Sequence, residues 1–398
     1  MSTMTPRERI LRAYDRQEVD RPPVCPLLTR WVRGRRGSPS ELHQLYAAEE
    51  FGLDPLICYG SYINHPIASD YVYRPGSDAD YRDLPDVNVE VGVENRKDRT
   101  VHSRRFETPD GVLSDRIVWA RSNMTFGDGP NPHREEPLVR SIDDLPALRH
   151  LYASPQPSFA DSLRMFTEIL GQRALVEYGD WTNAGCWGME SLGPEQMLVS
   201  ALTDKELLRG VLRVCQEVHL RNLKSVLESG QKHIVGSWFQ CGPSAGWSPT
   251  HISEFFLPLI REVVKLVHSY DATYRFQDDG KMAGIIPQLV EMNVDVIGAL
   301  QPPPLGDCVF GELKRQYGDR VCLFGGLDPI YTFELGNAEK VRDAVKELLE
   351  QAGDSRGVVI SAAEAFGPAT PEDCIRELGK TVREHTANRI HNGNHKRS

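Results

Sequence analysis

The chain has 398 residues, of which 40% are hydrophobic and 26% are charged, the composition of an ordinary globular protein. Its formal net charge of −10, with no long basic run, argues against nucleic acid and anionic membranes as partners. No apolar run approaches the roughly 20 residues of a membrane span. Because the charged N-terminal segment is also unlike a signal peptide, we expect a cytoplasmic protein.

Strand-like and helix-like segments alternate along the chain. The first helix is predicted at residues 5–16. Segments such as residues 204–229, 252–270 and 337–352 carry apolar residues every three to four positions and also predict helices. Eight short apolar runs predict buried strands, at residues 21–28, 55–62, 174–179, 233–240, 272–277, 294–301, 321–328 and 357–364. Eight strands with helices between them predict an α/β fold, the (β/α)8 TIM barrel.

A polar segment interrupts this alternation between the second and third strands. Residues 65–146 are rich in Asp, Arg, Gly and Pro, and Pro109-Asp110-Gly111 separates two strand-like runs, which is typical of a β-hairpin. We therefore predict a small β insertion that lies over the barrel mouth. The rest of residues 1–390 is predicted to form one barrel domain, and the polar residues 391–398 a disordered tail.

Several of the predicted strands end in polar residues. In a parallel barrel these ends converge on one mouth, where catalytic and binding groups lie. The polar residues are Gln277, Asp279, Gln301, Asp328 and Glu364. Asp328 precedes Pro329 and is also typical of a helix cap.

Aromatic residues accompany these strand ends. Tyr178, Trp181, Trp187 and Trp238 are predicted to form a substrate-binding wall, although large aromatic residues also fill gaps beneath loops. His65, just past the second strand, is a candidate substrate contact. Residues 30–36 hold four arginines, which suit either a solvated loop or an anion site.

Five short motifs resemble the uroporphyrinogen decarboxylase superfamily. They are Arg-Glu-Arg-Ile at 7–10, Asp-Arg-Pro-Pro-Val at 20–24, Trp-Ser-Pro at 247–249, Gly-Gly-Leu-Asp-Pro at 325–329 and Gly-Pro-Ala-Thr-Pro at 367–371. The resemblance covers nearly the whole chain. It implies a barrel enzyme, either a decarboxylase or a corrinoid-dependent methyltransferase.

The resemblance also indicates where the site lies. Thiol methyltransferases of this superfamily hold zinc on a His-x-Cys pair and a later Cys, and these positions are Gln277, Asp279 and Glu364 in this chain. All three offer oxygen, whereas zinc that activates a thiol prefers nitrogen and sulfur. If a divalent metal is present, these residues hold it; otherwise they hydrogen-bond the substrate.

True uroporphyrinogen decarboxylases fit no better. Residues 28–36 have arginines but not the Met-Arg-Gln-Ala-Gly-Arg motif that binds the tetrapyrrole carboxylates, and an acid, Glu364, replaces a His. An acid there would repel a polycarboxylate substrate. The sequence is therefore closer to the methyltransferase-like branch.

From these residues we expect an enzyme that moves a methyl group from a small neutral or cationic substrate to a corrinoid on a partner protein. Glu364 or Asp279 would protonate the leaving atom, and Gln277 and Gln301 would orient the substrate. Two alternatives remain open. One is a decarboxylase or lyase that acts on a small carboxylated substrate, including a uroporphyrinogen decarboxylase-like activity; the other is a non-catalytic ligand-binding barrel.

Overall fold

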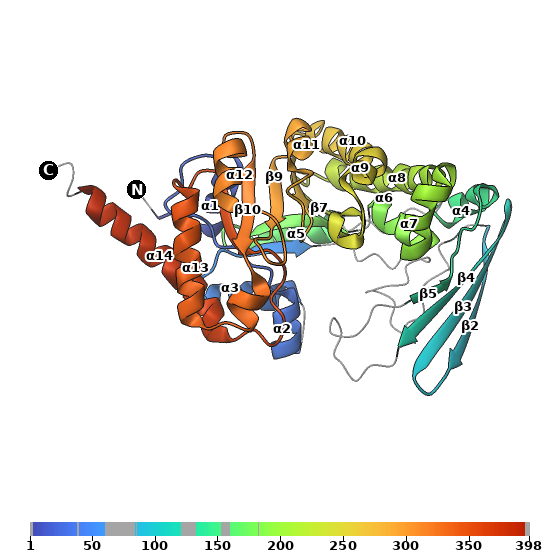
Figure 1. The fold of residues 1–398 in the computed structure, drawn as a ribbon, viewed down its shortest axis with the longest axis horizontal. Coiled ribbons are helices and arrows are strands. Elements are labelled where there is room, and N and C mark those ends of the chain that lie inside the picture. Colours follow the sequence, from blue (N-terminus) through green and yellow to red (C-terminus); the bar gives the residue numbers. More distant parts are fainter. Residues whose placement is uncertain are drawn as a thin grey trace.

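A curled parallel β-sheet lies at the centre of the computed structural model, which describes residues 3–37, 40–59, 84, 86–120, 133–152, 160–181 and 183–394 (Figure 1). Its seven strands have the order β1-β6-β7-β8-β9-β10-β11, and all neighbouring pairs are parallel. The strands are β1 Leu56–Tyr59, β6 Leu175–Asp180, β7 His233–Ser237, β8 Thr273–Gln277, β9 Val296–Leu300, β10 Cys322–Leu327 and β11 Val358–Ala362. The α/β class and the parallel order agree with the sequence prediction.

The predicted eighth strand, at residues 21–28, does not form as a regular strand. This segment makes one parallel bridge, between Val24 and Ile360 of β11, so the described sheet has seven strands. Pro22, Pro23 and Pro26 explain the difference, because proline has no N–H to donate to a strand partner. The segment still lies along β11, where Cys25 N–H donates to the Ile360 carbonyl (2.9 Å).

Helices cover the sheet. They are α1 Pro6–Tyr14, α2 Thr29–Arg36, α3 Glu41–Glu50, α4 Leu145–Leu151, α5 Ala160–Leu170, α6 Ala184–Leu192, α7 Pro194–Thr203, α8 Lys205–Glu228, α9 Pro249–His251, α10 Leu257–His268, α11 Ile286–Glu291, α12 Phe310–Tyr317, α13 Ala338–Ala352 and α14 Glu372–Asn394. Short 3-10 turns occur at η2 Ile142–Asp144, η3 Phe239–Cys241 and η4 Pro243–Ala245, and π-helical turns at η5 Ile252–Phe256 and η6 Pro329–Glu334. The helices predicted at residues 5–16, 204–229 and 337–352 are thereby confirmed as α1, α8 and α13.

Two helical predictions need correction. The segment at residues 252–270 is divided into η5 and α10, and Pro258 accounts for the break because it cannot donate to the preceding turn. At the C-terminal end, α14 runs to Asn394, so residues 391–394 are helical where the sequence predicts a tail.

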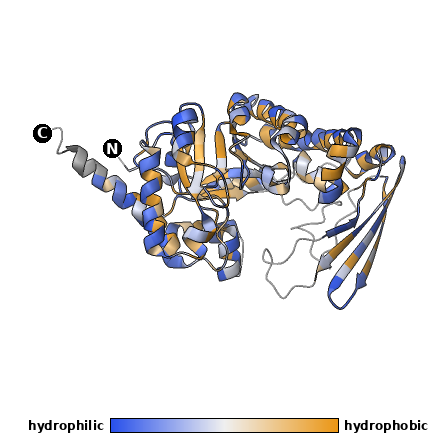
Figure 2. Ribbon diagram, in the orientation of Figure 1, coloured by the Kyte–Doolittle hydropathy of each residue, from blue (hydrophilic) through white to orange (hydrophobic). Residues whose placement is uncertain are grey.

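The two faces of the sheet belong to different hydrophobic clusters. The large cluster lies between the sheet and the outer helices and includes Ile234, Leu323 and Ile360. The smaller one joins the inner face to α1 and includes Tyr14 and Phe324. Because both faces are covered, the strands are apolar throughout, and Figure 2 shows hydrophobic colour along β9 and β10 and hydrophilic colour on much of α13 and α14.

A four-stranded antiparallel sheet comes between β1 and β6 in the sequence, in the order β2-β3-β4-β5. Its strands are β2 Asn88–Asn95, β3 Arg99–Thr108, β4 Gly111–Ala120 and β5 His133–Glu136. The predicted hairpin is confirmed, because Pro109 and Asp110 connect β3 to β4. Figure 1 shows this sheet at the end of the molecule opposite α14, beside α4 and α7. Its predicted location over the mouth stays a prediction.

All eight cysteines are free thiols. Within the described ranges, no helix combines the length and apolarity that crossing a membrane requires.

Candidate active site

A cavity of about 390 Å³ opens at the carboxyl ends of β8, β9, β10 and β11. Three of the predicted site residues meet in it: Asp279 follows β8, Gln301 follows β9 and Glu364 follows β11. The complete lining is Arg30, Asp279, Gln301, Pro329, Ile330, Glu334, Glu364, Ala365, Gly367, Pro368 and Ala369. The structure thus brings together residues that lie far apart in the sequence, at the end of the sheet where barrel enzymes place their chemistry.

Glu364 is the strongest candidate for an acid in this cavity. Burial raises the pKa of its carboxyl to about 7, and the Asp279 carboxylate adds to the rise. The Ala365 N–H, which donates to Glu364 Oε1 (2.7 Å), and the Arg30 guanidinium oppose it. A carboxyl with this pKa can donate and accept a proton near neutral pH.

Two adjacent carboxyls follow β8, and only one of them faces the cavity. Asp279 lines the cavity, and burial raises the pKa of its carboxyl. Asp278 is fully buried; burial and the Asp279 charge raise its pKa well above the ordinary range. Asp278 Oδ1 accepts the Asp279 N–H (2.8 Å) and so helps to fix the turn that carries Asp279. Asp278 is not among the predicted site residues, because only burial distinguishes it from its neighbour Asp279.

Gln301 holds the loop that carries Asp279. Its Oε1 accepts the Gly280 N–H (2.8 Å), and its side chain is buried. Gly280 has a φ of +67°, which an L side chain rarely adopts, so this turn favours glycine. Gln301 therefore fixes the backbone between β8 and the cavity while part of its surface lines the cavity.

Gln277 lies one layer below the mouth, on the inner face of the sheet. Its Oε1 accepts a hydrogen bond from Nη1 of the fully buried Arg275. Arg275 also donates to both carboxylate oxygens of Glu177, at 3.1 and 2.5 Å, and Tyr14 Oη donates to Glu177 (2.8 Å). The buried charges are thus paired within the sheet, which is the condition for burying them.

Two buried hydrogen-bond donors lie in this layer, and neither residue lines the cavity. Gln277 Nε2 and the Ser237 hydroxyl are buried and have no partner in the part of the chain that the structure describes. They are opposite each other on β8 and β7, so they lie on the same face of the sheet. Since Gln277 Oε1 is engaged with Arg275, the amide can only donate here.

The residues do not fit the zinc site of the thiol methyltransferases. Gln277 presents its oxygen to Arg275 rather than to the mouth, and no group of three His, Cys, Asp or Glu in the described ranges is arranged to hold a metal. The remaining donors from the predicted set, Asp279 and Glu364, are both carboxylates. We therefore assign no chemical step to a metal at this position.

Most of the aromatic residues that were predicted to line the substrate site lie in the hydrophobic core instead. Tyr178, Trp187 and Trp238 are at most 3% exposed and belong to the large hydrophobic cluster, and none of them lines the cavity. Trp238 Nε1 donates to Tyr274 Oη (2.9 Å). Trp181 is half-buried and stacks on Phe239, with ring centroids 6.4 Å apart. His65 lies outside the described residues.

The structure also shows the positions of Asp328, at the end of β10, and of Arg30. Asp328 Oδ1 accepts the N–H groups of Ile330 (2.8 Å) and Tyr331 (2.6 Å), so the predicted cap is confirmed, at the start of η6. Arg30 belongs to the helix α2 and not to a solvated loop, and its side chain lines the cavity. It is the cation among the cavity's side chains, beside the carboxylates of Asp279, Glu334 and Glu364.

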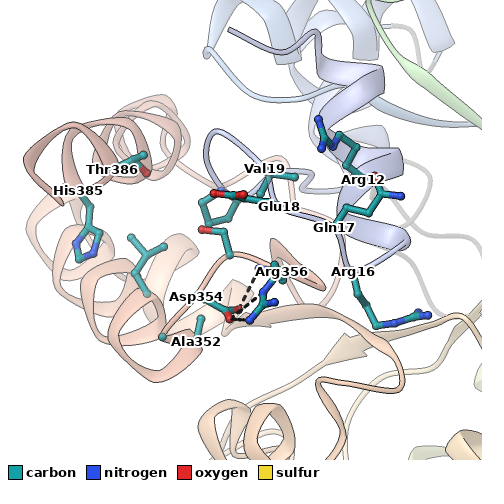
Figure 3. Close-up of a pocket in the computed structure, with 14 residues that line it drawn as sticks. Arg12, Arg16, Gln17, Glu18, Val19, Ala352, Asp354, Arg356, His385 and Thr386 are labelled. Carbon is teal, nitrogen blue, oxygen red and sulfur yellow. Dashed lines mark hydrogen bonds and ion pairs between the residues drawn. The ribbon is translucent and has the colours of Figure 1, made fainter. Parts of the chain in front are cut away.

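A second cavity, of about 760 Å³, lies between the segment after α1, the segment before β11 and α14 (Figure 3). It is at the amino end of β11, away from the strand ends that form the mouth. Its central charges are paired: Asp354 bonds Arg356 (2.7 Å) and lies 3.1 Å from Lys314 Nζ. Although this cavity is larger, barrel enzymes place catalysis at the opposite end of their strands.

Comparison with known proteins identifies the family. The family model described as uroporphyrinogen decarboxylase matches residues 121–385, more than half of the chain. The chain belongs to the uroporphyrinogen decarboxylase family. Among curated members, it is 22% identical to uroporphyrinogen decarboxylase of Thioalkalivibrio sulfidiphilus over 331 residues, which cover 77% of this chain and 86% of that protein. It is also 22% identical to the enzyme of Herminiimonas arsenicoxydans over 304 residues, covering 70% and 79%.

A solved structure of a methyltransferase from Methanosarcina mazei has the same fold. Its TM-score to this chain is 0.61 at 14% sequence identity, and the alignment covers 96% of this chain and 99% of the methyltransferase. Membership of the uroporphyrinogen decarboxylase family thus accounts for the fold, and with it for the convergence of the strand ends on one cavity. The choice between decarboxylase and methyltransferase chemistry rests on the cavity itself.

Proposed function

We propose that this protein is a methyltransferase that takes a methyl group from a small neutral or cationic substrate and transfers it to a corrinoid on a partner protein. The observation that carries the proposal is Glu364, a cavity carboxyl whose pKa is raised to about 7. The oxygen or nitrogen of a neutral methylated compound is a poor leaving group unless it gains a proton as the methyl group departs, whereas a methylated ammonium leaves as a neutral amine. In the proposed reaction Glu364 supplies that proton.

The cavity suits a small substrate. Its volume of about 390 Å³ is near the lower end of the range of about 300–1,000 Å³ for ligand pockets. Three carboxylic acids and one arginine line it, a balance that favours neutral or cationic compounds over polyanions.

In the proposed step, the bond between the methyl carbon and its heteroatom breaks, and the methyl carbon binds the reduced acceptor, which provides the bonding electron pair. The heteroatom keeps the pair of the broken bond and takes the proton of Glu364. The demethylated product leaves, and the Glu364 carboxylate regains a proton from solvent. Asp279 favours the protonated form of Glu364 through its negative charge.

A second candidate is decarboxylation of a small carboxylated substrate. Arg30 in the same cavity favours it, because a guanidinium can hold a carboxylate in two parallel hydrogen bonds. Glu364 would then protonate the carbon from which CO₂ departs. Both candidates use the same acid and differ in their products.

The test incubates the purified protein with a reduced Co(I) corrinoid protein and a panel of methoxylated compounds and methylated amines. Methyl-cobalt formation, followed by absorbance, is expected with wild type and lost in Glu364→Ala. CO₂ release from carboxylated compounds without methyl-cobalt would establish the second candidate. A folded protein that binds a compound from either panel and converts none would instead be a ligand-binding barrel.

A further inference from the structure

The outer strand of the antiparallel sheet, β2, is an unusual edge. It has eight residues, of which seven are exposed, and it pairs only with β3 among the described strands. Natural edge strands are protected by shortness, proline, lysine or bulges. The other edge of this sheet follows that rule, because β5 has four residues and its register with β4 shifts at a bulge. The β2–β3 register has no such shift, and residues 88–95 contain neither proline nor lysine.

The β2 strand also carries an apolar stripe. Val89, Val91 and Val93 alternate along the strand and therefore share one face of the sheet. Val91 is 40% exposed and Val93 is 54% exposed. A valine stripe on an edge that no described strand pairs is a surface that another strand can cover.

We propose that β2 pairs with β2 of a second copy of this chain, antiparallel and around a two-fold axis at Val91, to form one continuous eight-stranded sheet. Such an axis pairs Val91 with itself. It also places Val89 of each copy opposite Val93 of the other. The three valines of each strand thus form one apolar row, in which cross-strand β-branched pairs stabilise the sheet.

The positions of the Glu90 and Glu94 carboxylates favour this register over the neighbouring ones. A two-fold axis at Glu90 would place that side chain opposite its own copy, and an axis at Gly92 would place Glu90 opposite Glu94. Like charges directly opposite each other destabilise a strand pair. The axis at Val91 instead places Glu90 opposite Gly92, and Glu94 opposite Asn88. Axes farther from the strand centre pair fewer residues.

The remaining charge on this edge is partly neutralised within each chain. Glu94 bonds Arg96 (2.9 Å), and Glu90 lies 3.9 Å from Arg105 Nη1 on β3. The second copy therefore approaches an edge whose carboxylates already have cations nearby. This favours a copy of the same strand over a basic partner, for which the edge offers less free negative charge.

The experiment measures molar mass by light scattering after size-exclusion chromatography, over a range of protein concentrations. Wild type is expected to be a dimer, and Val91→Lys, which places two lysines opposite each other, is expected to be a monomer. Val112→Lys is the matched control, because Val112 is 53% exposed and lies on the inner strand β4. Circular dichroism confirms that each variant folds.

Cysteine pairs test the register directly. Residues opposite each other in an antiparallel pair have Cα atoms about 4.5–5.5 Å apart, within disulfide range. Val91→Cys is therefore expected to cross-link on mild oxidation. Val93→Cys is the control, because its two copies would lie four residues apart, about 13 Å. A wild-type monomer at every concentration, a dimer that persists in Val91→Lys, or equal cross-linking of the two cysteine variants would each overturn the proposal.

Discussion

Replacement of Glu364 by Gln tests the proposed acid while preserving the size of the side chain. A glutamate with the ordinary pKa of 4.5 holds its proton in well under 1% of molecules at pH 7, whereas a pKa of about 7 leaves about half protonated. Burial in the cavity thus enlarges the fraction of usable acid roughly a hundredfold. A positioned general acid contributes about 10²–10⁴-fold to a rate, so we expect Glu364→Gln to lose that much methyl transfer.

The loss should depend on the leaving group. A substrate that releases an alkoxide-like oxygen needs the proton, whereas a phenol with electron-withdrawing substituents leaves readily without one. We therefore expect a large loss with the first substrate and a small loss with the second. The assay follows methyl-cobalt absorbance with both substrates between pH 5.5 and 8.5. In wild type the rate should fall as the pH rises through about 7, where Glu364 loses its proton.

The control is Glu334→Gln, which removes another carboxyl from the same cavity. This variant should keep both the pH inflection and the dependence on the leaving group. Equal losses with the two substrates, or a wild-type pH profile retained in Glu364→Gln, would refute the assignment of Glu364 as the acid. A structural role would lower both rates together.

Three further predictions concern stability and are measured by urea unfolding. Asp328→Ala removes the cap of η6 and should lower the free energy of unfolding by about 1–2 kcal/mol, whereas Asp328→Asn should cost much less. Arg275→Met leaves Glu177 buried without its cation and should cost about 3–5 kcal/mol, most of which Arg275→Met with Glu177→Gln should recover. The hydrogen bond to Asp295 raises the pKa of His268, so this pair stabilises the fold below about pH 6.5 and less as the pH rises through the folded pKa. His268→Gln should therefore destabilise the protein more at pH 5.5 than at pH 8.5.

Much of the fold followed from local patterns. Short apolar runs, separated by helical segments, predicted every strand of the parallel sheet, because strands covered on both faces are apolar throughout. The strand at residues 21–28 failed for a local reason as well: its apolar composition was right, but three prolines removed the donors that a regular ladder needs. The hairpin at Pro109 and Asp110 was predictable because a two-residue turn restricts the residues it accepts.

The positions of the cavity residues along the sheet were predictable, whereas the faces on which the side chains lie were less so. Strand-end location correctly gathered Asp279, Gln301 and Glu364 around one cavity. The same rule also selected Trp187 and Trp238, whose side chains are in the core. A strand end fixes where a residue lies along the sheet, but which face it presents depends on the register and on the helix that packs beside it. For Arg30 the sequence left a solvated loop and an anion site open, since its place depends on how α2 packs against the loop after β11.

The pairing of Gln277 with Arg275 gives a physical reason why this chain does not keep the zinc pattern that its resemblance to the superfamily implies. These residues are two apart on β8 and share the inner face, so the buried guanidinium needs an acceptor at position 277 as well as the two oxygens of Glu177. A metal-bound histidine presents its second ring nitrogen as an N–H donor and could not accept from Arg275. A glutamine oxygen accepts, and its amide nitrogen has no partner among the described residues. Arg275 therefore favours glutamine over a metal ligand at residue 277, and for this reason we place substrate activation in the proposed reaction on the proton of Glu364.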